Sequence, residues 1–269
     1  MKVNILSLGI TAPGLVNFAS FKKLIKSGQA PDISQPLEKY SPAFLPANER
    51  RRTTATIKLA LATAEEAWNH YRGCYPDETD QIPVLFVSRD GDTMISARMC
   101  EAVNDEEPMI SPTHFHNSVH NAPAGYWMIG QNNQAPASAI SVGSFSIANG
   151  LLEAVLQSQT AAKPVLVVFY DLPVDPAIPT NFNQPQNVPF ACSMVLSADD
   201  LIQSDEFPSL TIKLDREPGN HKEDNPYKGV PAAEAYTLLK SMILVENKVG
   251  PFEISYPISK NNFIKVVIS

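Results

Sequence analysis

Ser144 is the residue of this 269-residue chain whose type and setting first suggest chemistry. It follows a short run of small and apolar residues, 137–142, and precedes a helical pattern that begins near Ser146. A hydroxyl at a turn between a strand and a helix can act as a nucleophile when a base activates it. The local sequence VGSFS lacks the Gly-x-Ser-x-Gly pattern of hydrolases, and no His/Asp pair stands out downstream. We therefore favour a helix N-cap role for Ser144 or Ser146, with an acyltransferase or hydrolase that uses Ser144 as the alternative.

Three histidines, His114, His116 and His120, form a second group with chemical potential. In one continuous helix His116 and His120 would share a face, which is a spacing that suits zinc. No further cysteine or carboxylate ligand stands beside them in the sequence. We expect these histidines to pack and form hydrogen bonds, and we predict neither a metal nor another cofactor.

Two charged segments and one aromatic pair complete the candidates. Arg50-Arg51-Arg52 could attract an acidic partner through complementary charge, but a solvated helix entrance explains the same run. Residues 88–92 (SRDGD) could bind phosphate or metal, yet a surface turn after a strand is the simpler interpretation. The pair Tyr126-Trp127 is expected in the core or in an interface.

The composition excludes several classes of protein. A net charge of −7 and a pI near 5.3 argue against binding of nucleic acid or an anionic membrane through bulk charge. The first residues lack the long apolar region of a signal peptide, and we find no apolar run of about 20 residues that could span a membrane. Cys74, Cys100 and Cys192 are far apart and odd in number, so they indicate neither a disulfide framework nor zinc spacing. We expect a soluble, cytosolic protein.

The elements that must position these residues alternate along the chain up to residue 171. This alternation predicts an α/β sandwich with a largely parallel sheet. In this part we expect strands at residues 3–8, 83–87, 137–142 and 164–170, and helices at 18–27, 48–71, 93–103 and 146–159. After a loop rich in proline and asparagine, we expect a helix at 232–242 and strands at 191–196, 210–214, 252–256 and 263–268.

Residues 111–150 read SPTHFHNSVHNAPAGYWMIGQNNQAPASAISVGSFSIANG. They resemble the β-ketoacyl synthase segment that leads from a dimer-interface helix into the turn with the catalytic cysteine. A weaker resemblance extends over roughly residues 1–215, and HNSVHNAPAGYW is most similar to small ketosynthase-like N-terminal-domain proteins of aryl polyene biosynthesis. The resemblance implies a thiolase-like α/β fold with a complete first half, residues 1–198. A truncated second half, residues 199–269, would pack on the same core as one compact unit.

The resemblance also shows which catalytic groups differ. Ser144 stands where the family has its cysteine, and His221 is the one histidine downstream, where a ketosynthase uses two. About seventy residues follow Ala198, whereas a full ketosynthase continues for well over a hundred. We therefore expect a non-catalytic, chain-length-factor-like subunit that forms a heterodimer with a catalytic ketosynthase.

Such a partnership implies roles for the interface residues. The strand at 135–142 would pair across the dimer axis and would be an exposed edge in a monomer, so the isolated chain should self-associate or be poorly soluble. An acyl carrier protein is a further candidate partner, and a self-associating scaffold is the third hypothesis. Side chains at the interface helix and the turn would shape the acyl pocket of the partner; the candidates are Phe115, His116, Val119, His120, Ser144 and Phe145.

Overall fold

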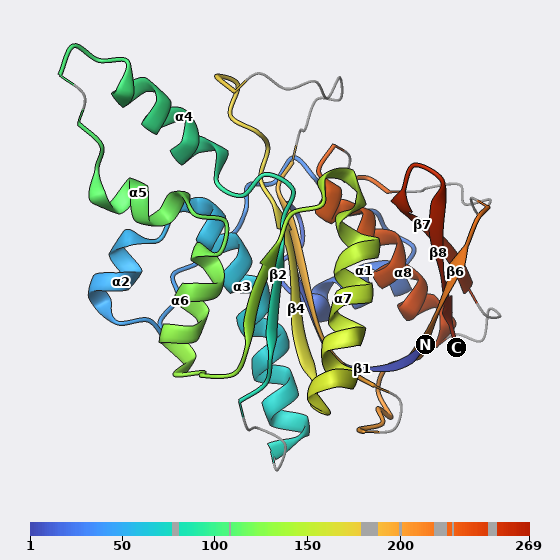
Figure 1. Ribbon diagram of the computed structural model, residues 1–269. Coiled ribbons are helices and arrows are strands. Elements are labelled where there is room, and N and C mark those ends of the chain that lie inside the picture. The colour runs from blue at the N-terminus through green and yellow to red at the C-terminus, as the bar shows by residue number, and fades with distance from the viewer. Residues whose placement is uncertain are drawn as a thin grey trace.

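The structure is a computed structural model that describes residues 1–76, 81–107, 109–178, 188–198, 201–217, 225–227, 229–246 and 252–269. In these residues the strands form an eight-stranded sheet in the order β3-β2-β4-β5-β1-β6-β8-β7 (Figure 1). The strands are β1 (Lys2–Thr11), β2 (Val84–Val87), β3 (Ala137–Ile140), β4 (Val165–Asp171), β5 (Phe190–Ala198), β6 (Ser209–Asp215), β7 (Phe252–Ser259) and β8 (Asn262–Ile268).

The sheet is mixed. Strand β2 pairs in parallel with β3 and β4, and the other described pairs are antiparallel. The expectation of a largely parallel sheet is therefore wrong for the sheet as a whole. For β7 and β8 the antiparallel pairing has a local cause. Only two residues separate these strands, and a hairpin this short can join only antiparallel strands.

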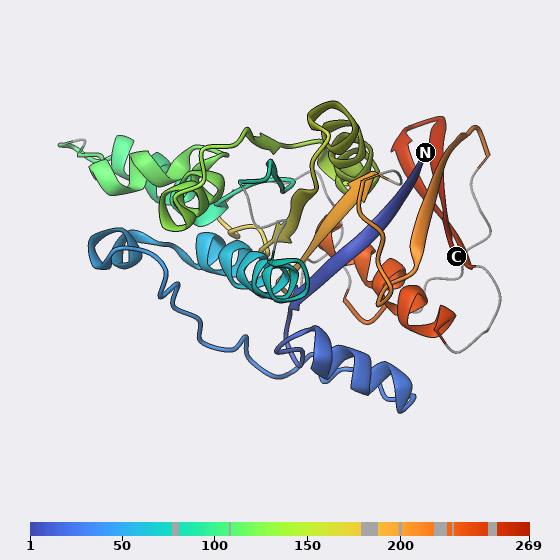
Figure 2. The ribbon, with the colours of Figure 1, turned by 90° about the horizontal axis from the view of Figure 1, so that it is seen from below.

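Helices cover both faces of the sheet, so the α/β prediction is confirmed. They are α1 (Phe18–Lys26), α2 (Ala47–Arg52), α3 (Ala55–Cys74), α4 (Thr93–Val103), α5 (Pro112–Ser118), α6 (Ala122–Gln131), α7 (Ser146–Ala161) and α8 (Ala235–Val245). One hydrophobic cluster joins α3 and α6 to one face of the sheet, and a second cluster joins α1, α7 and α8 to the other (Figures 1 and 2). No helix in the described ranges is both long and apolar enough to cross a membrane.

The helix expected at residues 48–71 is two helices in the structure. Helix α2 ends at Arg52, and the extended backbone of Thr53 and Thr54 separates it from α3. The Thr53 hydroxyl donates to the Arg50 carbonyl, and the Thr54 hydroxyl accepts from the backbone N–H of Ile57. The break has a physical cause, since threonine hydroxyls that bond to nearby backbone groups end and begin helices.

Helix α7 packs directly on β2 and β4. A Cβ atom at Gly150 would overlap the Phe169 ring of β4 and would lie 3.0 Å from Cγ2 of Val87 in β2. A glycine is thus required at this crossing, since only its missing side chain permits such close approach. The crossing fixes the first turns of α7, and with them the turn that carries Ser144.

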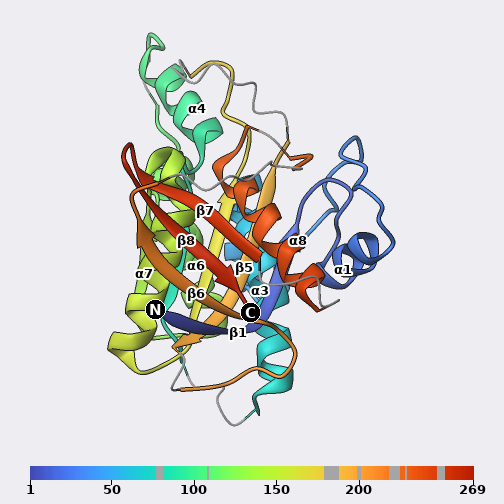
Figure 3. The same ribbon diagram turned by 90° about the vertical axis from the view of Figure 1, so that its right-hand side faces the viewer.

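The two edges of the sheet differ. Strand β3 forms one edge, and β7, which faces the viewer in Figure 3, forms the other. Strand β7 contains Pro257, and its pairing with β8 is irregular between Pro257 and Ser259. Its Glu253 pairs with Lys265 at 3.2 Å. A proline, a bulge and charged side chains are the features that block further strand pairing, and β3 has none of them.

Candidate functional site

The serine turn, residues 140–146, joins the edge strand to α7. Strand β3 ends at Ile140, and a 3-10 turn over Gly143–Phe145 leads directly into Ser146. The φ angle of Gly143 is +58°, a backbone conformation that favours glycine over residues with a side chain. The predicted order of strand, glycine turn and helix is confirmed, although the strand is two residues shorter than expected.

The two serines of the turn have different environments. Ser144 is exposed, and its hydroxyl makes no hydrogen bond within the described residues. Ser146 is 1% exposed and donates to the Gly143 carbonyl at 2.7 Å. Phe145 is the N-cap residue of α7, and no side chain caps this helix. The N-cap role predicted for Ser144 or Ser146 is therefore wrong, because the Ser146 hydroxyl bonds back into the turn instead of to the helix.

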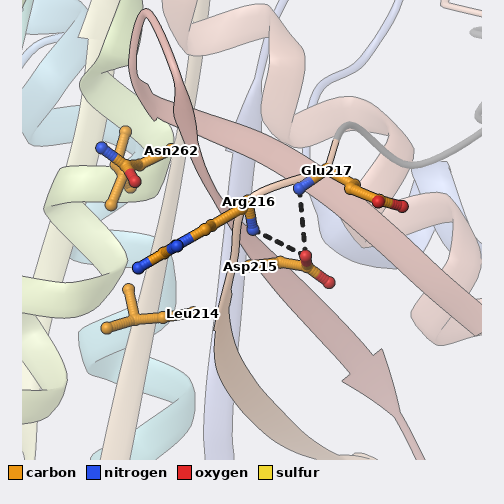
Figure 4. A pocket seen from close by; sticks show the side chains of 6 residues that line it. Leu214, Asp215, Arg216, Glu217 and Asn262 are labelled. Carbon is orange, nitrogen blue, oxygen red and sulfur yellow. Dashed lines mark hydrogen bonds between the residues drawn. The ribbon is translucent and has the colours of Figure 1, made fainter.

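The second half of the chain supports the serine turn. The side-chain amide of Asn149 donates to the carbonyls of Phe145 at 2.9 Å and of Ile258 in β7 at 3.3 Å. Ile258 also lines a cleft of about 670 Å³ at the β7–β8 turn, with Leu214, Asp215, Arg216, Glu217 and Asn262 (Figure 4). The Asp215 carboxylate accepts from the backbone N–H groups of Arg216 and Glu217 and pairs with Lys265 at 2.9 Å. This cleft thus lies beside the beginning of α7.

The expected interface helix is broken between Ser118 and Ala122. Pro123 explains the break, because in a continuous helix its ring would clash with the carbonyl of Val119. His116 lies in α5 and His120 follows its end, so the two do not share a helix face. These two residues therefore do not form the shared helix face that a zinc pair would need.

The two histidines have separate partners. The His116 ring packs edge-on against Tyr126, with centroids 6.0 Å apart. The His120 ring donates through Nε2 to the Ile140 carbonyl at 3.0 Å, and its other nitrogen faces Gly91. His120 therefore fixes the end of β3 against the loop after β2. Tyr126 and Trp127 are buried, as predicted.

Several candidate residues present apolar surface to solvent. Phe115 is 63% exposed and Val119 is 49% exposed, whereas Phe145 is half-buried in the serine turn. Met109 and Ile110, just before α5, are also exposed. Since exposed aromatic and aliphatic side chains gathered on neighbouring elements mark contact surfaces, this part of the molecule is a candidate interface.

The open edge of β3 has a defined pattern of free backbone groups. The carbonyls of Pro136 and Ile140 accept hydrogen bonds from β2. Because successive residues of a strand direct their backbone groups to opposite sides, Ala137 and Ala139 direct theirs to the open side. The side chains of β3 (ASAI) are small or apolar. The prediction that this strand is an exposed edge in the single chain is confirmed.

The helices that pack beside β3 carry exposed apolar side chains. Ile129 of α6 is 55% exposed, and Leu156 of α7 is 49% exposed. An unpaired strand bordered by exposed apolar helices provides backbone and hydrophobic contacts for a second sheet. We call β3 together with Ile129 and Leu156 the open edge.

A buried carboxylate connects the loop after β2 to the end of β4. Asp171 accepts hydrogen bonds of 2.9 Å each from the Ser88 hydroxyl and from the backbone N–H groups of Arg89 and Ala232. Burial raises the pKa of Asp171 to about 6, even though these hydrogen bonds favour the charged form. Ser88 and Arg89 are buried, so the surface turn expected at residues 88–92 is wrong for its first two residues. Asp171 was not predicted, because its local signal is merely an acidic residue that ends an apolar run.

A basic cleft of about 450 Å³ lies between the α2–α3 junction, α4 and α5. Arg51, Arg52 and Arg98 line it together with His114 and the first residues of α3, and Asp92 is the acidic side chain of the lining. Arg98 is exposed and has no ion-pair partner among the described residues. Three guanidinium groups beside a helix N-terminus favour an anionic ligand. Arg51 and Arg52 were predicted as a basic run, but Arg98 was not.

Comparison with known proteins gives a match to one protein family and similarity to solved structures. A family model described as beta-ketoacyl synthase, N-terminal domain, matches residues 25–247. No curated protein sequence matches the chain significantly. A ketosynthase (ApeO) in complex with its chain length factor (ApeC) from Xenorhabdus doucetiae is similar, with 20% identity over 99% of each chain and a TM-score of 0.70.

Two further structures share the fold at lower identity. The ishigamide ketosynthase/chain length factor is 11% identical, with a TM-score of 0.72 over 100% of this chain and 99% of that chain. A type II polyketide synthase acyl carrier protein in complex with its ketosynthase (AntDE:AntF) is 12% identical, with a TM-score of 0.73 and the same coverage. The three similarities show that the chain has the thiolase-like fold of ketosynthases.

Proposed function

The chain belongs to the β-ketoacyl synthase N-terminal-domain family, and on that basis we propose that it is a non-catalytic, chain-length-factor-like subunit of a catalytic ketosynthase. The observation that carries the proposal is the open edge beside the serine turn, in which the resemblance puts Ser144 at the position of the family's cysteine. Two of the similar structures are themselves ketosynthases with chain length factors. The resemblance of residues 111–150 supports aryl polyene or related fatty-acid and polyketide-type biosynthesis as the pathway.

The open edge supports the heterodimer. A strand from the ketosynthase can pair with the outward backbone groups of Ala137 and Ala139, and the small side chains of β3 permit close approach. We propose that the partner also contacts Ile129 and Leu156, which are largely exposed in the single chain. A permanent complex of this kind buries at least about 2,000 Å² in total.

Ser144 supports the non-catalytic role. Condensation needs a thiolate to carry the acyl chain, and a serine hydroxyl becomes a comparable nucleophile only next to a base. The Ser144 hydroxyl has no hydrogen-bonded base among the described residues. His221, the one histidine downstream of Ser144 in the sequence, lies outside the described residues. An acyltransferase or hydrolase that uses Ser144 would need such a base next to the hydroxyl, either in the free protein or after substrate has bound.

We propose that apolar residues of this subunit limit the length of the acyl chain in the pocket of the ketosynthase. Phe115 and Val119 are exposed in the single chain and are free to enter the pocket of a partner, and we propose the same role for His116, His120 and Phe145. We also propose that residues 1–198 form the ketosynthase-like half and residues 199–269 the shortened half. The pairing of β6 with β1 joins both parts in one sheet.

Three free cysteines agree with a reducing compartment such as the cytoplasm.

The basic cleft is the proposed contact with an acyl carrier protein. Carrier proteins of this class are acidic, and complementary charge speeds association more than it raises affinity. Charge reversal of Arg98, Arg98→Glu, should weaken carrier-protein binding at low salt and leave the heterodimer intact. Reversal of the exposed Lys213 on β6 serves as the matched control, because it lies outside the cleft.

The decisive experiment combines association with activity. The purified chain is run on size-exclusion chromatography alone and with a catalytic ketosynthase from the same genome, and both samples are incubated with malonyl- and acyl-carrier protein. We expect a stable heterodimer, elongated products from the complex, and none from the chain alone. Ser144→Ala should keep the activity of the complex within a few-fold of the parent. Turnover by the isolated chain, or a loss of 10²–10⁴-fold in the Ser144→Ala complex, would instead establish an enzyme.

A further inference from the structure

A group of metal-ligating side chains lies at the C-terminal end of α3. The ligand atoms of His70, Cys74 and Glu206 all lie within 4.8 Å of one another. His70 Nε2 is 3.2 Å from Glu206 Oε2 and 3.8 Å from Cys74 Sγ. This end of α3 and the serine turn lie at opposite ends of the sheet (Figure 1). The group is therefore separate from the serine turn.

The local structure positions each of the three side chains. His70 and Cys74 are four residues apart in α3, so they project from the same face of the helix. Glu206 belongs to the segment between β5 and β6, where the Ser204 hydroxyl accepts from the backbone N–H groups of Glu206 and Phe207. Two elements distant in sequence thus meet at one point.

Phe207 anchors the segment that carries Glu206. It is only 7% exposed, and its ring contacts the rings of Phe18 at 5.8 Å and of His70 at 5.9 Å between centroids. Glu206, its neighbour, is held toward His70 by this packing. The arrangement is consequently largely preformed, which lowers the entropy that a ligand would have to remove on binding.

We propose that His70, Cys74 and Glu206 bind a zinc ion. Imidazole, thiolate and carboxylate are the ligands that zinc takes in proteins, and three protein ligands leave a fourth position for water. Bonds of about 2.0–2.3 Å place the ligands of a tetrahedral zinc about 3.3–3.7 Å apart. The distances of 3.2 and 3.8 Å at His70 Nε2 are close to these separations.

A simple ion pair accounts for less of the geometry. An ion pair between His70 and Glu206 explains their distance, and the i,i+4 spacing in α3 brings the Cys74 thiol near the same nitrogen, but an ion pair gives the thiol no role. A zinc ion explains all three positions. It would also join α3, in the first half of the chain, to the segment that leads into β6, and so stabilise the contact between the halves. This inference does not depend on the pairing with a ketosynthase.

Metal titrations of the full chain test the site. The protein is treated with a chelator, desalted and titrated with Zn²⁺ by calorimetry and with Co²⁺ by absorption spectroscopy. We expect one equivalent of either ion to bind, with a thiolate-to-cobalt charge-transfer band and a higher melting temperature in Zn²⁺. Each of His70→Gln, Cys74→Ser and Glu206→Gln should weaken binding by at least about tenfold, since even residues that only orient ligands have effects of that size.

Cys100→Ser is the matched control, because Cys100 is an exposed thiol on α4 outside the group. This variant should bind both ions as the parent does and keep the charge-transfer band. Circular dichroism establishes that each variant is folded before titration. Absence of binding by the parent overturns the proposal, and so does a charge-transfer band that persists in Cys74→Ser or disappears in Cys100→Ser.

Discussion

The Asp171 carboxylate at the end of β4 accepts a 2.9 Å hydrogen bond from the hydroxyl of Ser88, which follows β2, and both residues are buried. The same carboxylate accepts from the backbone of Ala232, in the turn that precedes α8. One side chain therefore connects two neighbouring strand ends to the second half of the chain. Arg89, whose backbone N–H donates to this carboxylate, accepts at its carbonyl from the Ser141 hydroxyl of the serine turn.

Replacement of Asp171 should destabilise the fold strongly. Asp171→Ala leaves three buried donors without an acceptor, and each such donor costs about 1–3 kcal/mol, so the free energy of unfolding should fall by about 3 kcal/mol or more. Asp171→Asn keeps one acceptor oxygen and should cost less. Urea unfolding followed by circular dichroism measures both. Asp175→Asn, at a carboxylate whose bond to Ala177 is exposed, is the control and should change stability by under about 0.5 kcal/mol.

The pH dependence of stability should report Glu66 of α3. Its carboxylate accepts from the backbone N–H groups of Ile10 at 2.9 Å and Phe18 at 2.6 Å, yet burial raises its pKa from 4.5 to about 7. A folded-state pKa above the unfolded value means that the folded chain binds the extra proton. Stability from this group is therefore present in full below pH 4.5 and is lost as the pH rises to about 7.

Glu66→Gln separates this effect from the other titrating groups. Between about pH 4 and pH 8 the stability of the parent should fall relative to the variant by about 2 kcal/mol, allowing for partial exposure of the carboxylate to solvent. Urea unfolding of both proteins across the pH range gives the difference. A parent that gains stability relative to the variant over this window would contradict the raised pKa.

Charges placed on the open edge should prevent the heterodimer. Ile129→Asp and Leu156→Asp each put a carboxylate where apolar surface would be buried. Burial of this unpaired charge should lower the affinity of the subunit for the ketosynthase several-fold or more. Val16→Asp is the control, since Val16 is 57% exposed, much like Ile129, but follows β1. Size-exclusion chromatography with the ketosynthase should show loss of the complex for the first two variants and its retention for the control. Equal behaviour of all three would place the interface elsewhere.

Trimming the aromatic residues near the open edge should lengthen the products. Phe115→Ala or Phe145→Ala would vacate space at the end of the partner's acyl pocket, and burial of extra hydrocarbon is favourable by about 25 cal/mol per Å². Because Phe115 is 63% exposed, its loss should leave the subunit stable. Mass spectrometry of carrier-bound products from parent and variant complexes measures the shift. Unchanged lengths at Phe115, His116, Val119 and Phe145 would indicate a scaffold that does not gauge the chain.

Local patterns were sufficient to predict most of the serine turn. Helix α7 begins at Ser146 as its periodicity predicts, and Gly143 supplies the positive φ angle between strand and helix. The break at Thr53-Thr54 was missed because the apolar residues follow one helical pattern across it. The hydrogen bonds of the two threonine hydroxyls to the backbone nevertheless end α2 and begin α3. The break after α5 was missed although its cause, Pro123, is visible in the sequence.

Relationships across long sequence separations were not predictable. Asp171 meets Ser88 and Ala232 only when strands far apart in the chain become neighbours. Glu206 likewise reaches His70 through the connection between β5 and β6. The helical spacing of His70 and Cys74 is visible in the sequence, but two ligands alone do not specify a metal site. Local sequence patterns do not predict such long-range contacts, since these depend on the topology of the whole sheet.

The unequal edges of the sheet determine how large an assembly can become. A β-sheet that adds strands at both of its edges can polymerise into a fibre, whereas one with a single available edge stops after one partner. Pro257 and the irregular pairing beside it make β7 unsuitable for further strands, while β3 remains available. The fold therefore limits edge pairing to two molecules, and an excess of subunit should yield dimers and not filaments.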